Sequence, residues 1–120
     1  MISFVGAGPG AADLITLRGR DRLARADVVI WASSLVPEAL LQHADARTQI
    51  HDSAAMTFED VIGVYETHRG DRIVRLHSGD PSVYGAIQEQ IDWCIAAGRD
   101  FEIVQGSVRW RRRRPQSGAS

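Results

Sequence analysis

The sequence lacks lysine altogether, although it carries 14 arginines among its 120 residues. Its one cysteine, Cys94, cannot form an internal disulfide. It also lacks the run of ~18 apolar residues that a membrane span requires, and residues 1–30 do not have the basic start and long apolar stretch of a signal peptide. We therefore expect a single domain in the cytoplasm with no membrane partner, and 44% hydrophobic with 24% charged residues suits such a domain.

Short apolar runs alternate with helical patterns along the chain. We predict strands at Ile2–Val5, Val28–Trp31, Thr48–His51, Arg72–His77 and Phe101–Val104. We predict helices at Leu17–Ala26, Pro37–His43, Thr57–Arg69 and Gly85–Ala97. This alternation predicts an α/β fold, a parallel sheet with flanking helices on both faces. Ligands of such sheets bind at the carboxyl ends of the strands, where residues 6–13 and 78–85 form two distinctive loops.

Two of the predicted helices carry more detailed signals. Thr57 and Asp60 resemble a capping box at the start of one helix, and Gly70 is the expected glycine just past its end. In the last helix, one apolar face is expected to comprise Ile87, Ile91, Cys94 and Ile95.

The first loop, residues 6–11, reads GAGPGA and fits the pattern G-x-G-x-x-G/A after a strand. A dinucleotide site also needs an acid about 20 residues further on, at the end of the second strand. That strand runs into Ala32-Ser33-Ser34, and Asp27 lies at its other end. The missing acid argues against dinucleotide, flavin and common Rossmann-like methyltransferase sites. A tight turn without a ligand remains an alternative.

The second loop, residues 78–85, reads SGDPSVYG. Gly79 permits close approach of a ligand to the backbone, and Asp80 either caps the following helix or helps to hold that ligand. His77, just before the loop, either contacts a substrate or tunes the loop, or it makes only a local hydrogen bond. The four histidines of the chain show no metal-ligand spacing.

Together, VGAGPGAADLITL at residues 5–17 and RLHSGDPSVYGA at residues 75–86 resemble the tetrapyrrole methylase family, over Ile2 to about Gly106. The resemblance implies the N-terminal domain of a two-domain class III methyltransferase fold. It also implies S-adenosyl-L-methionine as the methyl donor, bound in a cleft between the two domains. The positions that the resemblance places at the donor are Gly8, Pro9, Ser78, Gly79, Asp80 and Val83.

Within the family, three stretches resemble the precorrin-4 methyltransferases: Trp31–Val36, Asp52–Thr57 and His77–Ser82. The resemblance implies methylation of ring carbon 11 of a corrin precursor, precorrin-4 to precorrin-5, in cobalamin biosynthesis. It further implies a tetrapyrrole substrate, no metal, and a homodimer in the full-length form. The uroporphyrinogen methylases carry an Asp where this chain has Ala32, which argues against that branch. Neither the catalytic base nor the presence of cobalt in the substrate follows from the sequence.

The last residues differ in composition from the rest. Residues 1–104 hold nine arginines and 15 acids, whereas residues 105–120 hold five arginines and no acid. The family continues with Pro-Gly-Val and an alanine-rich helix, and a one-base slip in a GC-rich gene converts alanine codons into arginine codons. We therefore expect a domain over residues 1–106, a frameshifted and disordered tail over residues 107–120, and no C-terminal domain, leaving the truncated chain inactive.

Two other functions remain open on the residues alone. Arginines 109–114 with Trp110 could form a basic arm that binds nucleic acid through phosphate contacts and stacking. The first loop could also belong to half of a dinucleotide oxidoreductase. The resemblance favours neither, and implies no nucleic-acid partner.

Overall fold

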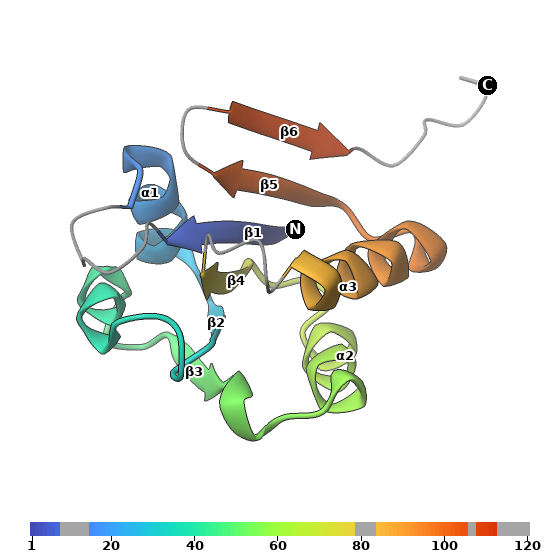
Figure 1. Ribbon diagram of the computed structural model, residues 1–120, viewed down its shortest axis with the longest axis horizontal. Coiled ribbons are helices and arrows are strands. Elements are labelled where there is room, and N and C mark those ends of the chain that lie inside the picture. Colours follow the sequence, from blue (N-terminus) through green and yellow to red (C-terminus); the bar gives the residue numbers. More distant parts are fainter. Residues whose placement is uncertain (8–14, 79–83, 106–107, 113–120) are drawn as a thin grey trace.

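The computed structural model describes residues 1–7, 15–78, 84–105 and 108–112 (Figure 1). The strands in these ranges are β1 (Ile2–Ala7), β2 (Val28–Trp31), β3 (Gln49–Asp52), β4 (Ile73–Ser78), β5 (Phe101–Gln105) and β6 (Val108–Arg112). The α-helices are α1 (Leu17–Arg25), α2 (Phe58–Thr67) and α3 (Tyr84–Ala97), and the 3-10 helices are η1 (Glu38–His43) and η2 (Ser53–Ala55). None of the helices in the described part of the chain is long and apolar enough to cross a membrane.

The strands form one sheet in the order β3-β2-β4-β1-β5-β6. The first five run parallel, and connections between parallel neighbours must cross a face of the sheet, which the helices do. The predicted α/β fold with a parallel sheet is therefore confirmed. Figure 1 shows α2 and α3 on one side of the sheet and α1 on the other.

The sixth strand was not predicted from the sequence. β6 pairs antiparallel with β5, from Gln105 opposite Val108 to Phe101 opposite Arg112. These five residues lie within the tail that the sequence analysis expects to be disordered. The sequence does carry a signal for a strand pair here, because Gly-Ser is a dipeptide typical of hairpin turns and Val108 and Trp110 alternate with arginines. Pairing also covers backbone groups of β5 that an edge strand would leave open.

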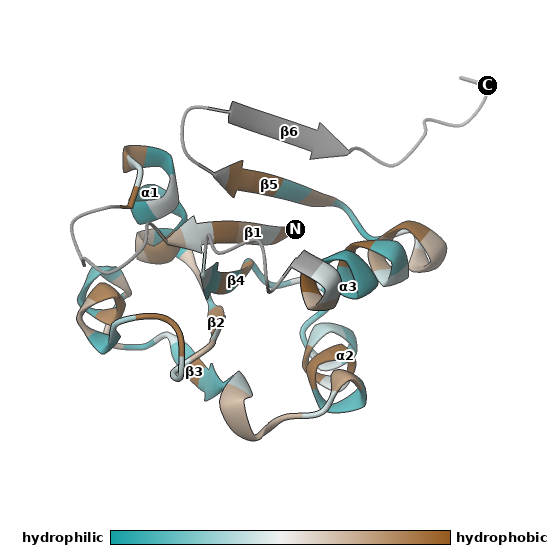
Figure 2. Ribbon diagram, in the orientation of Figure 1, coloured by the Kyte–Doolittle hydropathy of each residue, from teal (hydrophilic) through white to brown (hydrophobic). Residues whose placement is uncertain are grey.

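Alternating side chains of the strands build two cores, one on each face. Ile2, Phe4 and Ile30 belong to the core that α2 and α3 cover. Val5 and Val29, their neighbours in sequence, belong to the core that α1 and η1 cover. Because successive strand residues point to opposite faces, most positions of the buried strands are apolar. Figure 2 shows brown, hydrophobic segments along β1 and β5.

The helix boundaries agree only partly with expectation. The capping box is confirmed: Thr57 accepts a hydrogen bond from the backbone of Asp60, and Asp60 accepts one from that of Thr57. The end of α2 was predicted wrongly, since the helix stops at Thr67 and Gly70 lies beyond its cap. The segment predicted as a helix after Pro37 forms the 3-10 helix η1.

The packing of α3 confirms most of its predicted face. Ile87, Ile91 and Cys94 are buried against the sheet, but Ile95 is 48% exposed. Position 95 lies about 100° around the helix from Cys94, which turns it out of the core. Burial raises the pKa of the Cys94 thiol to about 11, so the thiol stays protonated at neutral pH.

Helix α1 lies very close to the sheet at Gly19. A β-carbon at this position would stand 2.8 Å from Cγ1 of Val5 and 3.0 Å from Cγ1 of Ile15. Both neighbours are branched side chains, one of them in a fully buried strand. Glycine is therefore required here by close approach rather than by backbone conformation.

Replacing Gly19 by alanine should lower the free energy of unfolding by about 1–3 kcal/mol, because overpacking outweighs the better helix propensity. The matched control is Gly63→Ala in α2, where a β-carbon meets nothing within 4 Å. That change should stabilise by up to about 1 kcal/mol. Urea denaturation of both variants measures the difference, and equal effects of the same sign would refute the close contact.

Candidate functional site

The central strands β1 and β4 end side by side. They pair in parallel, with Gly6 opposite His77 and Ala7 opposite Ser78. The two distinctive loops of the sequence, residues 6–13 and 78–85, begin at the ends of these two strands. The two strands therefore end at the same edge of the sheet, as the sequence analysis expects for the strands that precede the two loops.

The connections that follow β1 and β4 leave toward opposite faces. The chain after β1 leads into α1 on one face, and the chain after β4 leads into α3 on the other (Figure 1). In an open α/β sheet, a crevice for ligands forms at such a point, outside the carboxyl ends of the two strands. The residues at the ends of these strands are small: Gly6 and Ala7 in β1 and Ser78 in β4.

One of the predicted donor-site residues lies in the described part of the chain. Ser78 is the last residue of β4, half-buried beside Ala7. The others lie outside the described residues: Gly8, Pro9, Gly79, Asp80 and Val83. Their contact with a methyl donor remains a prediction, as does the role of Ser78.

His77, near the carboxyl end of β4, makes a local hydrogen bond. Its side chain is buried, and Nδ1 lies 2.8 Å from the carbonyl oxygen of Ser78. Burial lowers the pKa of His77, the bond to Ser78 partly opposes this, and the nearby charge of Arg75 lowers the pKa further. The imidazole is therefore neutral at pH 7.

A buried polar cluster lies on the same face of the sheet and was not foreseen. Gln90 of α3 accepts two hydrogen bonds at Oε1, from the Tyr65 hydroxyl at 2.6 Å and from Nε of Arg75 at 3.3 Å. Nη1 of Arg75 also donates to the carbonyl oxygens of Ile30, at 3.5 Å, and Leu76, at 3.3 Å. Neutral oxygens, rather than a carboxylate, thus accept these hydrogen bonds from the guanidinium.

Burial has the expected electrostatic effects on the cluster. It lowers the pKa of Arg75 and raises that of Tyr65. Arg75 is thus buried within strand β4 rather than exposed on a helix. The available signal was its position within a strand of alternating pattern, which places Arg75 and His77 on the same face as Ile73.

An acid does lie beside the end of β2, but it comes from the next strand. Asp52 ends β3 and is paired in register with Trp31. Its Oδ1 accepts hydrogen bonds from the backbone N–H of Ser33, at 3.4 Å, and of Ala54, at 2.9 Å. The pKa of Asp52 is lowered chiefly by the side chain of Ser33 and next by the backbone N–H of Ala54. This oxygen therefore holds the turns that follow β2 and β3.

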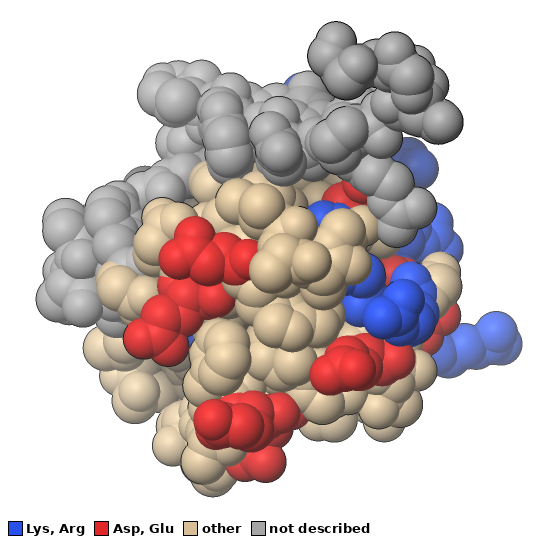
Figure 3. Space-filling model, turned by 90° about the vertical axis from the view of Figure 1, so that its right-hand side faces the viewer, with Lys and Arg blue, Asp and Glu red and all other residues tan. Residues whose placement is uncertain are grey.

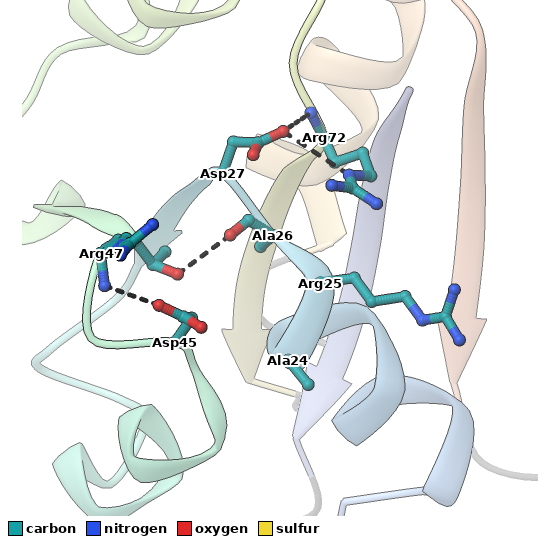
Figure 4. A pocket seen from close by; sticks show the side chains of 8 residues that line it. Ala24, Arg25, Ala26, Asp27, Asp45, Arg47 and Arg72 are labelled. Atoms are coloured by element: carbon teal, nitrogen blue, oxygen red, sulfur yellow. Dashed lines mark hydrogen bonds and ion pairs between the residues drawn. The ribbon is translucent and has the colours of Figure 1, made fainter.

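A pocket of about 410 Å³ lies at the opposite edge, where the strands begin. Asp27 accepts a hydrogen bond from the backbone N–H of Arg72, and Asp45 accepts one from that of Arg47 (Figure 4). The guanidinium of Arg25 extends away from these pairs and binds Asp21. Figure 3 views another side of the molecule from Figure 1 and shows acidic and basic side chains close together on it. Because charges of both signs line this pocket and most of them have partners within the protein, we assign it a structural role rather than a role in ligand binding.

A metal centre finds no support in the side chains of residues 1–7, 15–78 and 85–104, since these contain no group of three or more potential ligands among His, Cys, Asp and Glu.

The fold is that of an α/β protein with a parallel sheet, whose ligand site is predicted at the ends of β1 and β4. The family model for tetrapyrrole (corrin/porphyrin) methylases matches residues 1–107. The chain belongs to this family, as the sequence motifs predicted.

Named relatives agree with this assignment. A cobalt-precorrin-4 C(11)-methyltransferase of Methanocaldococcus jannaschii is 47% identical over 107 residues, covering 88% of this chain and 41% of the archaeal protein. A precorrin-4 C(11)-methyltransferase of Pseudomonas aeruginosa is 43% identical, with 88% and 42% covered. The solved structure of a cobalt precorrin-4 methyltransferase superposes with a TM-score of 0.79 at 40% identity, with 88% and 45% covered. This chain thus spans less than half the length of the relatives it matches.

Removing the shared acceptor of the polar cluster should be costly. Gln90→Leu leaves the Tyr65 hydroxyl and Nε of Arg75 without this partner inside the protein, which should lower the free energy of unfolding by about 2–4 kcal/mol. Gln88→Leu, at an exposed position of the same helix, should change it by less than about 0.5 kcal/mol. Chemical denaturation of both variants tests this, and a loss of under about 1 kcal/mol for Gln90→Leu would contradict the assigned bonds.

The lowered pKa of His77 predicts a pH dependence of stability. The folded state resists protonation, whereas the unfolded histidine, with its ordinary pKa of 6.5, accepts the proton. The contribution of His77 is therefore fully present above pH 6.5 and is lost as the pH falls toward its lowered folded-state pKa. His77→Asn should weaken the fall in stability between about pH 7 and pH 5. Urea midpoints at both pH values measure it, and parallel pH profiles would contradict it.

Proposed function

We propose that this chain contributes the methyl-donor half of an S-adenosylmethionine-dependent methyltransferase that acts on ring carbon 11 of a corrin precursor, precorrin-4 or its cobalt form. The observation that carries the proposal is the parallel pairing of β1 with β4, which ends at the register Ala7–Ser78. The glycine-rich segment and the Gly-Asp-Pro segment both begin there. The identity to precorrin-4 methyltransferases supports the choice of substrate.

The residues of the crevice suit a donor that carries a positive charge and a polar amino-acid end. When bound, S-adenosylmethionine supplies a methyl group attached to a sulfonium, which is already an activated leaving group. The part of this chain is to hold and orient that donor, since alignment of the reactants can supply much of the rate enhancement. Small residues at the strand ends admit the ligand, loop backbone groups bind it, and Asp80 provides a carboxylate for its cationic part.

The rest of the activity is proposed for an assembly larger than these 120 residues. More than half of each matched relative lies outside the matched region. We therefore expect this chain alone to bind the donor weakly and to show no methyl transfer, and we expect the full assembly to be a cytoplasmic homodimer. Methyl transfer by the purified 120-residue chain would refute the expected inactivity.

Donor binding can be tested on the chain by NMR titration with S-adenosylhomocysteine, the demethylated donor. Resonances of Ala7 and Ser78 should shift, whereas those of Asp27 and Arg72, at the opposite edge, should not. Asp80→Asn should weaken binding about tenfold, as loss of one charge-assisted contact would. Asp45→Asn, in the pocket at the other edge, is the matched control. Shifts confined to the opposite edge, or no saturable shift, would count against the proposed site.

We also propose that the arginine-rich end arises from a frameshift near codon 105. The change of composition at this point and the end of the family match at residue 107 support it. The test is to resequence the gene from codon 95 onward and to read all three frames. A Pro-Gly-Val continuation one frame over would bear the proposal out, and its absence would make the arginine segment a native part of the protein.

A further inference from the structure

The side chain of His77 forms a hydrogen bond with the last carbonyl oxygen of β4. Its Nδ1 lies 2.8 Å from the carbonyl oxygen of Ser78, the final residue of the strand, and the ring belongs to a residue that is 3% exposed. A carbonyl oxygen can only accept, so Nδ1 must carry the proton and donate. The structure therefore fixes the tautomer of this histidine.

The other ring nitrogen shows that the bond to Ser78 is the main polar contact of His77. Nε2 is buried and has no hydrogen-bond partner among the described residues. Since Nδ1 holds the proton, Nε2 carries only a lone pair. Protonating it would place a second cation near buried Arg75, which faces the same side of β4. The neutral, Nδ1-protonated form is thus favoured by both burial and charge.

The position of this bond matters because the Gly-Asp-Pro loop comes directly after Ser78 in the chain. Ser78 stands in register with Ala7 at the end of the parallel pairing between β1 and β4. The peptide group that carries its carbonyl is planar, and it leads into residues 79–83. A hydrogen bond from a buried ring to this carbonyl therefore fixes the plane in which the chain leaves the sheet.

We propose that His77 is a positioning residue at the end of β4: it sets the orientation of the Ser78 peptide, after which the Gly-Asp-Pro segment begins in the sequence. The effect on ligand affinity rests on the proposed function, because that function makes this loop a wall of the donor site. The role requires a hydrogen-bond donor at Nδ1 and does not require the basicity of Nε2.

Two substitutions separate these requirements. His77→Asn keeps an N–H donor one bond beyond Cγ, where Nδ1 stands, and removes Nε2. His77→Leu keeps a branched apolar side chain and removes both nitrogens. Resonances of Asp27 and Arg72, at the far edge of the sheet, report whether each variant retains the fold.

The experiment is NMR on the full chain without ligand, followed by titration with S-adenosylhomocysteine. The wild type should show a proton on Nδ1, and His77→Asn should keep the amide resonances of residues 78–83 near their original positions. His77→Leu should displace them and weaken ligand binding about tenfold, whereas His77→Asn should weaken it less than about threefold.

A proton on Nε2 in the wild type, or equal displacement of the loop resonances by both variants, would overturn the positioning role. Failure of the wild-type chain to bind the ligand would instead contradict the proposed function. In that case, the tautomer and the loop resonances still decide whether His77 positions the loop. If His77→Leu does not fold, the tautomer in the wild type and the loop resonances in His77→Asn carry the test.

Discussion

The parallel pairing of β1 with β4 is the constraint on which the rest of the structure depends. These strands are far apart in the sequence, yet they lie in register from Ile2 opposite Ile73 to Ala7 opposite Ser78. The pairing places two loops of unusual composition at one edge and separates the helices that follow them onto opposite faces. A shift of the register by one residue would reverse the face of every β4 side chain, moving Arg75 and His77 to the α1 side.

The two faces of the sheet handle their buried polar groups differently. On the α1 face, the fully buried carboxylate of Glu102 in β5 pairs with Arg22 of α1. On the α3 face, Arg75 is held by Gln90 and by backbone carbonyl oxygens. An ion pair joins α1 to β5, whereas hydrogen bonds from Arg75 to neutral oxygens connect β4 to its neighbours. Both arrangements supply partners for groups whose burial would otherwise be costly.

Local features of the fold could be predicted from the sequence because their causes are local. The capping box at Thr57 and the alternation of strands and helices depend on neighbouring residues, and both were predicted. The strand order could not be predicted, since it depends on contacts between distant segments. The burial of Arg75 was not predicted either, because an arginine is expected to be exposed to solvent, and the partners that allow its burial, such as Gln90, come from a distant helix. At the site, the motifs located the two loops, whereas the role of the His77 side chain required its geometry.

The buried Cys94 can report the local unfolding of the helix that contains it. It is the single thiol of the chain, lies on the inner face of α3, and has a pKa raised to about 11. A thiol reagent reacts with the exposed thiolate, so labelling in native conditions must wait until α3 leaves the sheet. The labelling rate then measures the free energy of that local opening, in the same way as amide hydrogen exchange. The helix that follows the Gly-Asp-Pro loop can thereby be monitored without introducing any probe.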